Sequence, residues 1–236
     1  MRMIELDTIY NEDCLTGMQR IPDGSVDCCV TDPPYKLTSG GCCGGLDIVF
    51  NSADDDAVKK GELFEIPSFE TWMREVYRVL KDGTHFYCMT NDKNMKDMIS
   101  AAESVGFKEV NILVWAKQMH TPLPYYMKNV EFVLLFRKGR ARKINNMGDF
   151  ALIENIRGVF GNKVHPSEKP VPLFRKFVEN STNEGDTVLE PFMGSGTLAA
   201  ACKSCGRHFI GFELNRDYYD IALRRIKLEQ QQQTLF

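Results

Sequence analysis

Four consecutive residues that follow an apolar run near the N-terminus could carry chemistry: Asp32, Pro33, Pro34 and Tyr35, the sequence DPPY. Proline has a fixed φ and no N–H, and it pushes the preceding residue out of the helical region, so we expect a stiff, extended turn. The Asp32 carboxylate and the Pro33 carbonyl then offer two acceptors to a ligand amino group with two hydrogens. The Tyr35 ring could stack on a base, a contact worth about 1–3 kcal/mol. An ordinary surface turn is the alternative.

A second group of candidate residues lies in the stretch DTVLEPFMGSGTLAAACKSCGRHFIGFELN, residues 186–215. A predicted strand ends at Glu190, a tight turn carries Gly194 and Gly196, a helix follows, and a second strand ends at Glu213. Such a unit suits a nucleoside, because the glycines allow close approach to the backbone and the second acid can accept from ribose hydroxyls. Ala199 stands where the dinucleotide fingerprint has its third glycine, which argues against a pyrophosphate ligand. A purely structural turn is the alternative.

Alternating strand-like and helix-like segments must position these two groups. Short apolar runs bounded by turn residues predict strands, and apolar residues at helical spacing predict helices. This alternation is typical of an α/β fold, in which helices cover a sheet and ligands bind at the carboxyl ends of its strands. The predicted strands cover residues 26–30, 84–89, 110–115, 129–136, 187–190 and 207–213, and the predicted helices cover 69–80, 92–105, 172–180, 198–203 and 215–228.

Length and composition indicate one domain. The chain has 236 residues, of which 43% are hydrophobic, enough for one well-buried α/β domain and too little for two large ones. No apolar run is long enough for a membrane span and no stretch resembles a signal peptide, so we expect a soluble protein with no membrane partner. The net charge of −3 excludes a polycation, so any nucleic-acid surface must be local.

The eight cysteines do not indicate a disulfide framework. In a chain of this size without a secretory signal, we interpret them as reduced thiols. Cys202 and Cys205 form a lone CxxC pair in a predicted helix, without a second pair at the spacing of a zinc site, so we predict no metal.

Two irregular stretches and a tail interrupt the pattern. Residues 37–67 are rich in glycine and then in charge, and we expect a mobile loop near the active site. Residues 137–163 open with RKGRARK, whose basic side chains could contact nucleic-acid phosphates; a solvated turn is the alternative. These candidate phosphate-binding residues are Arg137, Lys138, Arg140, Arg142 and Lys143. Residues 230–236 are expected to be a disordered tail.

Three motifs together resemble those of a known family. DPPY and FMGSGT look like blocks of the S-adenosylmethionine-dependent amino-methyltransferases that methylate exocyclic amines of DNA bases, and HPSEKP, residues 165–170, is similar to their third block. The order, with DPPY first and the glycine block last, resembles the permuted β-class found in phage and in restriction or orphan systems. The resemblance extends from Tyr10 to about Arg225. It implies an α/β, Rossmann-like methyltransferase fold in a single domain, residues 1–229, whose mostly parallel sheet has an antiparallel edge hairpin.

The same resemblance implies how S-adenosylmethionine would be held. Glu213 would accept hydrogen bonds from the ribose hydroxyls, and the positive charge of Lys169 would pair with the methionine carboxylate. Asp13 and Cys14 match the block that contacts the adenine ring, although Glu12 stands where the family usually has glycine. The full set of implied cofactor-binding residues is Asp13, Cys14, Asp32, Ser167, Lys169, Glu190, Phe192, Gly194, Ser195, Gly196, Thr197, Glu213 and Leu214.

The resemblance also implies a reaction. The target nucleotide would be flipped out of the duplex and stacked on Tyr35. Acceptors at Asp32 and Pro33 would then favour a tetrahedral amine nitrogen and stabilise its growing positive charge, with no metal. Because an aspartate at the first motif position goes mostly with adenine in this family, the resemblance favours N6-adenine, with N4-cytosine as the alternative. Residues 137–163 lie where the β-class places its target-recognition region.

Other hypotheses stay open at this point. A methyltransferase of RNA or of a protein amide uses a related NPPY turn, but there the glycine motif precedes it. A nicotinamide-dependent oxidoreductase would leave DPPY and HPSEKP unexplained, and a non-catalytic DNA-binding relative would have no need of an intact Asp32. The expected partner is double-stranded DNA. The short recognition region suggests a short target, help from a second subunit in a homodimer, or loose specificity. The expected location is the cytoplasm of a bacterial or phage-infected cell.

Overall fold

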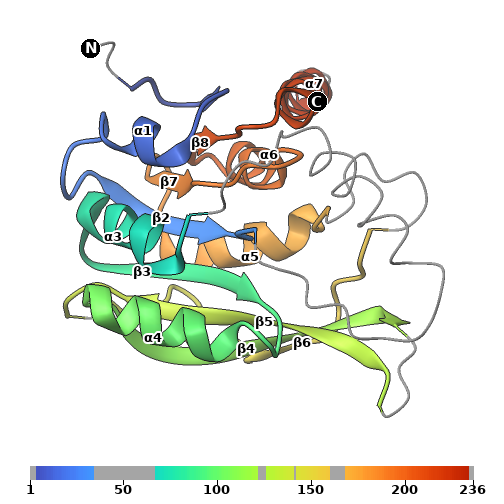
Figure 1. The fold of residues 1–236 in the computed structure, drawn as a ribbon. Helices are drawn as coiled ribbons and strands as arrows, with labels where there is room; N and C mark the ends of the chain where they lie inside the picture. The colour runs from blue at the N-terminus through green and yellow to red at the C-terminus, as the bar shows by residue number, and fades with distance from the viewer. Residues whose placement is uncertain (1–3, 35–66, 122–125, 141, 160–167, 234–236) are drawn as a thin grey trace, which may run out of the picture.

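The computed structural model describes residues 4–34, 67–121, 126–140, 142–159 and 168–233. These residues form one eight-stranded sheet with helices on both faces (Figure 1). The strand order is β1-β8-β7-β2-β3-β5-β4-β6. The strand bounds are Thr8–Tyr10 (β1), Val26–Thr31 (β2), Leu80–Thr90 (β3), Lys108–Thr121 (β4), Lys128–Arg137 (β5), Leu152–Ile153 (β6), Thr187–Glu190 (β7) and His208–Phe212 (β8).

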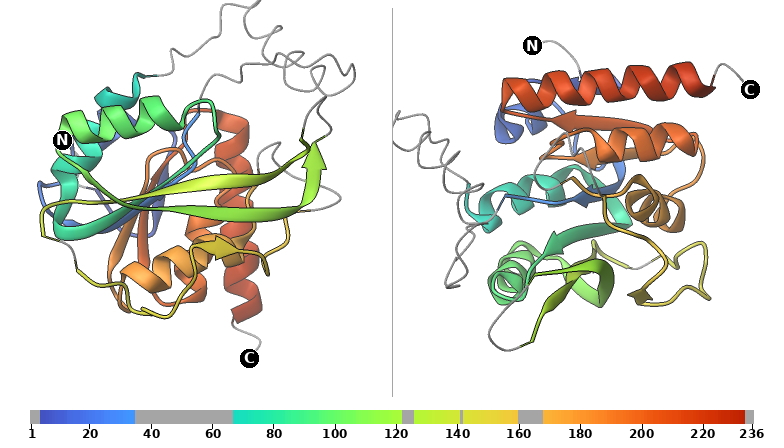
Figure 2. Two further views of the ribbon diagram at one scale, coloured as in Figure 1. Left: turned by 90° about the horizontal axis from the view of Figure 1, so that it is seen from below. Right: turned by 90° about the vertical axis from the view of Figure 1, so that its right-hand side faces the viewer.

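Strand β5 is the one described strand that runs against its neighbours. It is antiparallel to both β3 and β4, whereas every other pair in the sheet is parallel. The α/β fold with a mostly parallel sheet and an antiparallel hairpin, β4 with β5, is therefore confirmed. The sequence did not predict the two-residue strand β6, which lies outside this hairpin and pairs with Trp115 and its neighbour. Strand β4 is the longest described strand, and the hairpin that it forms with β5 extends past the neighbouring strands (Figure 2).

Six described helices form the two outer layers. The right-hand view of Figure 2 shows the sheet between them. One face carries α1 (Cys14–Met18), α3 (Phe69–Val79) and α4 (Met95–Val105), and the other carries α5 (Val171–Ser181), α6 (Thr197–Ser204) and α7 (Arg216–Gln233). Helix α7 reaches Gln233, so part of the segment 230–236 is helical rather than a disordered tail.

Successive side chains of the central strands point to opposite faces of the sheet and so contribute to the hydrophobic core on each face. In β3, Tyr87 and Met89 pack in the core under α5 and α6, whereas Phe86 and Cys88 pack in the core under α3 and α4. All four are nearly inaccessible to solvent. Because helices cover both faces, the strand reads as a continuous apolar run rather than as an apolar and polar alternation.

Local sequence signals set the helix ends. Helix α3 begins after Ser68, whose hydroxyl accepts from the Thr71 N–H at 3.3 Å. Helix α5 begins after Pro170, with a second proline in its first turn, where the missing N–H has no cost. Helix α4 ends at Gly106, which adopts φ of 117° and donates to the carbonyls of Ala102 and Glu103. In the part of the chain that the structure describes, no helix is both long and apolar enough to cross a membrane.

Candidate active site

The carboxyl ends of three neighbouring strands bring three acidic residues to one edge of the sheet. Asp32 follows β2, Glu190 is the last residue of β7, and Glu213 follows β8. Since neighbouring strands lie about 4.8 Å apart, the three strand ends form one continuous acidic edge. The DPPY turn and the glycine motif are far apart in the sequence, and the parallel pairing of β2 with β7 brings them together.

Asp32 is paired with Lys169. The Lys169 Nζ donates to Asp32 Oδ2 at 2.5 Å, and the two side chains are only 9% and 17% exposed, respectively. Burial raises the pKa of Asp32 above its ordinary value, and the Lys169 ammonium opposes that rise. Pro33 is buried and Pro34 is exposed. The structure thus places Lys169 at the predicted catalytic carboxylate.

Two further charged residues, which the motifs did not include, complete a network around Lys169. Glu131 Oε2 lies 3.5 Å from the Lys169 ammonium, and Glu131 Oε1 accepts from Lys117 Nζ at 2.7 Å. Burial acts to raise the pKa of Glu131, but the two ammonium groups outweigh it and hold the pKa below its ordinary value. Glu131 interrupts the apolar run NVEFVLLF on the same face as Val133 and Leu135, which are buried. An acid at an inward-facing strand position was the available signal.

The glycine turn is organised by the acid of the next strand. Glu213 Oε2 accepts from the Gly194 N–H at 2.8 Å, and its Oε1 accepts from the Asn215 N–H at 2.8 Å. Gly194 and Gly196 have φ of 53° and 81°, a region that favours glycine. Glu190 Oε1 accepts from the Phe192 N–H at 3.3 Å. Glu213 therefore orients the turn and still has lone pairs for a ligand hydroxyl.

Ser195, within the turn, and Thr197, which follows it, are buried rather than open to a ligand. Arg225 of α7 donates to the hydroxyls of both, at 3.2 and 3.3 Å, and pairs with Glu168 at 3.0 Å. The Thr197 hydroxyl also donates to the Lys169 carbonyl at 3.2 Å. Arg225 and Glu168 were not predicted; they connect the end of the HPSEKP block to the glycine turn.

The N-terminal block lies beside Glu213. The Glu213 N–H donates to the Tyr10 carbonyl at 3.0 Å, because β1 pairs with β8 at this edge. Asp13 caps α1 by accepting from the Thr16 N–H at 3.1 Å. Cys14 is buried, which raises the pKa of its thiol to about 12. The structure therefore places Cys14 near Glu213, and the contact of Asp13 and Cys14 with the adenine ring of a cofactor stays a prediction.

The charge at this edge fits a cationic ligand. Burial is the main cause that raises the pKa values of Asp32, Glu190 and Glu213 above their ordinary range. Each carboxylate would be stabilised in its ionised form by a positive charge brought into the site. S-adenosylmethionine carries a sulfonium and an ammonium group, so the residues present fit this cofactor.

The basic residues of the RKGRARK stretch are not beside Asp32. Arg137 pairs with His85, whereas Thr31, the residue before Asp32, lies level with Cys88. Because β5 is antiparallel, its carboxyl end lies at the opposite edge of the sheet, beside the start of β3 (Figure 1). The Lys138 ammonium there donates to two backbone carbonyls at the end of α3, at 2.6 and 2.7 Å. Phosphate contacts by this cluster remain a prediction.

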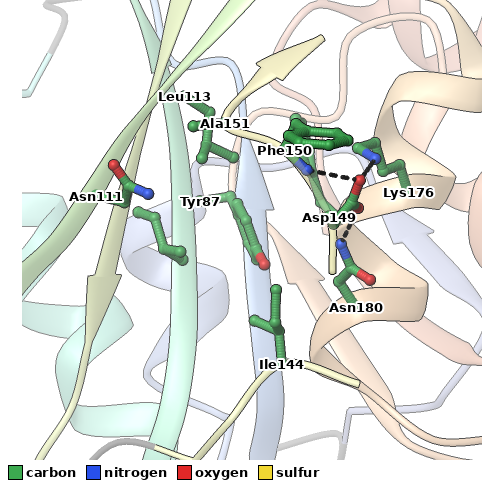
Figure 3. Close-up of a pocket in the computed structure, with 11 residues that line it drawn as sticks. Tyr87, Asn111, Leu113, Ile144, Asp149, Phe150, Ala151, Lys176 and Asn180 are labelled. Carbon is green, nitrogen blue, oxygen red and sulfur yellow. Dashed lines mark hydrogen bonds and ion pairs between the residues drawn. The ribbon is translucent and has the colours of Figure 1, made fainter. Parts of the chain in front are cut away.

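The middle of the segment 137–163 is held against helix α5. Asp149 accepts from Lys176 and, at 2.7 Å, from Asn180, as Figure 3 shows. Asn145 donates to two carbonyls at the end of α5 at 2.8 Å each. The cavity beside Asp149 measures about 70 Å³, which is too small for a nucleoside.

Several predicted residues lie outside the described part of the chain. These are Tyr35, Ser167 and residues 37–66 of the predicted loop, so their roles remain predictions. Among the residues that the structure describes, no group of three or more metal-ligating side chains occurs. The described cysteines, Cys202 and Cys205 among them, are free thiols.

A glycine substitution can separate backbone strain from packing at the turn. A Cβ at Gly196 would lie 3.1 Å from the Cβ of Ala222 in α7, in addition to the strain at φ of 81°. We expect Gly196→Ala to lower the free energy of unfolding by about 2–3 kcal/mol, measured by urea denaturation. Gly24 has φ of 59° and open space around it, so Gly24→Ala should cost only about 1–2 kcal/mol. Equal losses in the two variants would contradict the packing contribution.

A comparison with known protein families agrees with this geometry. A family model described as DNA methylase, of the N6/N4 methyltransferases, matches residues 26–224. The chain belongs to this family. The match contains both the Asp32 turn and the glycine turn, so the acidic edge described above is the candidate active site of a DNA amino-methyltransferase.

Individual proteins are similar to this DNA amino-methyltransferase over nearly its whole length. It is 29% identical to the type II methyltransferase M2.DpnII of Streptococcus pneumoniae over 94% of this chain and 90% of that protein. It is 27% identical to the type II methyltransferase M.HinfI of Haemophilus influenzae, over 94% of this chain and 68% of that protein. Its fold resembles a DNA modification methylase of Thermus thermophilus solved with S-adenosylmethionine, with a TM-score of 0.71, 22% identity and coverage of 94% and 93%.

Proposed function

We propose that this DNA methyltransferase transfers a methyl group from S-adenosylmethionine to the exocyclic N6 of a flipped-out adenine at a specific site in double-stranded DNA. The observation that supports this reaction most is the placement of the Asp32 carboxylate at the carboxyl end of β2, beside the glycine turn after β7. An acceptor for the target amine and a site for the methyl donor therefore adjoin at one edge.

The cofactor is S-adenosylmethionine, which supplies an electrophilic methyl group on a sulfonium when bound. Glu213 would accept hydrogen bonds from the ribose hydroxyls through the lone pairs that Gly194 and Asn215 do not use. Asp13 and Cys14, at the start of α1, would hold the adenine ring of the cofactor. The negative edge formed by Glu190 and Glu213 would stabilise the cofactor's positive charge.

The chain activates the target amine by accepting hydrogen bonds from it. An exocyclic amine is a poor nucleophile, because its lone pair is delocalised into the ring of the base. Hydrogen bonds to the Asp32 carboxylate and the Pro33 carbonyl favour a tetrahedral nitrogen with a directed lone pair, and stabilise the positive charge that grows on it. Tyr35 stacks on the flipped base, and duplex unstacking is the energetic cost of access.

Adenine is the proposed base because of the first residue of the DPPY motif. In the family that this chain resembles, aspartate at that position goes mostly with N6-adenine. The Asp32 carboxylate would accept from either amine, so the base has to be identified by experiment.

Methyl transfer from labelled S-adenosylmethionine to unmethylated genomic DNA tests the proposal. The DNA is digested to nucleosides and analysed by mass spectrometry, with the same reaction on RNA in parallel. We expect label in N6-methyladenine. Label in N4-methylcytosine would replace the proposed base, and label in RNA alone would overturn the DNA substrate.

The basic cluster at the opposite edge gives a separate prediction. If the exposed Arg140 and Arg142 contact phosphates, the double charge reversal Arg140→Glu and Arg142→Glu should weaken DNA binding and flatten its salt dependence by about two units of slope. Arg224→Glu, on the exposed side of α7, is the control for charge reversal away from this cluster, with half the change in net charge. Fluorescence anisotropy across a range of salt concentrations measures both. Unchanged binding would show that this cluster lies off the DNA path.

A further inference from the structure

Glu131 is a partly buried charged residue that the motifs leave without a role. Its side chain is 22% exposed and lies on the inward face of β5, in line with the buried Val133 and Leu135. A charge at such a position is costly unless it is paired. Glu131 has two cationic partners, Lys117 at 2.7 Å and Lys169 at 3.5 Å.

The topology of the hairpin explains how Glu131 reaches the site. Trp115 pairs directly with Glu131 across the hairpin, and Lys117 lies two residues further along β4. Alternate residues of a strand project to one face, so Glu131 and Lys117 both project to the face that carries α5. Lys169 precedes Pro170, the N-cap residue of that helix. The result is a row of alternating charges that runs from the catalytic carboxylate across the sheet: Asp32, Lys169, Glu131 and Lys117.

Lys169 and the target amine compete for the Asp32 carboxylate, and Glu131 can reduce this competition. Lys169 Nζ donates to Asp32 Oδ2 at 2.5 Å, and a charge-assisted bond of this kind is stronger than one from a neutral amine. The same carboxylate has to accept a hydrogen from the target base. The Glu131 carboxylate, 3.5 Å from the Lys169 ammonium, weakens the hydrogen bond from Lys169 to Asp32. The positive charge of Lys169 still lies close to Asp32.

We propose that Glu131 is a positioning residue that holds the Lys169 ammonium between two carboxylates, so that Asp32, kept ionised by Lys169, can release an oxygen to the target amine. Lys117 neutralises Glu131 and sets how strongly it competes for Lys169. The inference rests on the proposed function, because it takes Asp32 as the acceptor for the amine.

The charges that face Asp32 determine the sign of the expected effects. Glu131 of β5 and Glu190 of β7 act against its ionisation, and Lys169 and Lys117 favour it. The nearby thiol of Cys88 in β3 is buried with its pKa raised well above the ordinary value, so it is neutral. Removing the charge of Glu131 should lower the pKa of Asp32, and removing the charge of Lys117 should raise it.

The experiment compares Glu131→Gln, Lys117→Gln and the double variant in the full chain. Carbon-13 NMR of selectively labelled aspartate carboxyls gives the pKa of Asp32, whose signal is assigned by its loss in Asp32→Asn. The pH dependence of single-turnover methyl transfer is measured on the same proteins. Glu109→Gln, the same chemical change at the exposed far end of the hairpin, is the control.

We expect the pKa of Asp32 to fall by about one unit in Glu131→Gln and to rise in Lys117→Gln, with the double variant close to the wild type. The acid limb of the rate profile should shift in the same directions. The maximal rate of Glu131→Gln should fall about tenfold, because Lys169 then stays on Asp32. Glu109→Gln should change neither quantity.

Shifts of the same sign in the two single variants, or an unchanged Asp32 pKa in both, would overturn the inference even with normal methyl transfer. A purely structural role for Glu131 predicts lower stability without the opposite shifts. Should Glu131→Gln fail to fold, the upward shift in Lys117→Gln tests the same coupling. The NMR titration needs no substrate, so opposite shifts in a protein that methylates no base would support the coupling and overturn the proposed function instead.

Discussion

Replacing Asp32 with alanine should lower the single-turnover rate of methyl transfer on the order of 10³-fold, a loss comparable to that of a preorganised electrostatic group. The carboxylate lies at the end of β2 and is the proposed acceptor for the amine of the target base, so its removal should leave the nitrogen lone pair delocalised. Lys169 keeps Glu131 as a partner at 3.5 Å, which limits the structural damage. Rates are measured with saturating cofactor and DNA.

The affinity for S-adenosylmethionine separates this role from a general loss of structure. Isothermal titration calorimetry should show that Asp32→Ala binds the cofactor with nearly unchanged affinity. Asp32→Asn is the matched variant, since it keeps the shape and one oxygen acceptor but loses the charge, and it should retain more of the rate than alanine. Parallel loss of cofactor binding and turnover in both variants would contradict the assignment of Asp32 as the amine acceptor.

Replacing Glu213 with alanine should weaken the binding of S-adenosylmethionine by about 100-fold, equivalent to roughly 2.7 kcal/mol. The expected loss has two causes. The Glu213 carboxylate accepts from the Gly194 and Asn215 N–H groups, and its remaining lone pairs are available to the ribose hydroxyls. The alanine variant therefore loses ligand contacts and leaves the glycine turn without its organising acceptor.

Glu213→Gln is the control for this prediction. It keeps one oxygen acceptor at the same place, so we expect an affinity between those of the wild type and Glu213→Ala. Burial raises the pKa of Glu213, so protonation as the pH falls through this raised pKa should weaken cofactor binding in the wild type and leave the glutamine variant unaffected. Titration calorimetry at several pH values measures both effects. Unchanged affinity in the alanine variant would remove Glu213 from the cofactor site.

Much of the fold was predictable because local patterns reflect burial. The apolar runs of β2, β3 and β7 and the helical spacing in α3 predicted a sheet with helices on both faces, which the structure confirms. The same logic placed Asp32, Glu190 and Glu213 at strand ends. Since parallel strands direct their carboxyl ends to one edge, three sites remote in sequence were predictable as neighbours.

The sequence by itself therefore determined the fold class, the family and the acids at the strand ends, because motif spacing and burial patterns are local properties. Only the tertiary structure decided which charges meet. The antiparallel direction of β5 takes Arg137 to the opposite edge of the sheet and brings Glu131 to Lys169. Arg225 likewise reaches the glycine turn only because α7 packs beside α6. Strand direction and helix packing depend on contacts between distant residues, which no local pattern specifies.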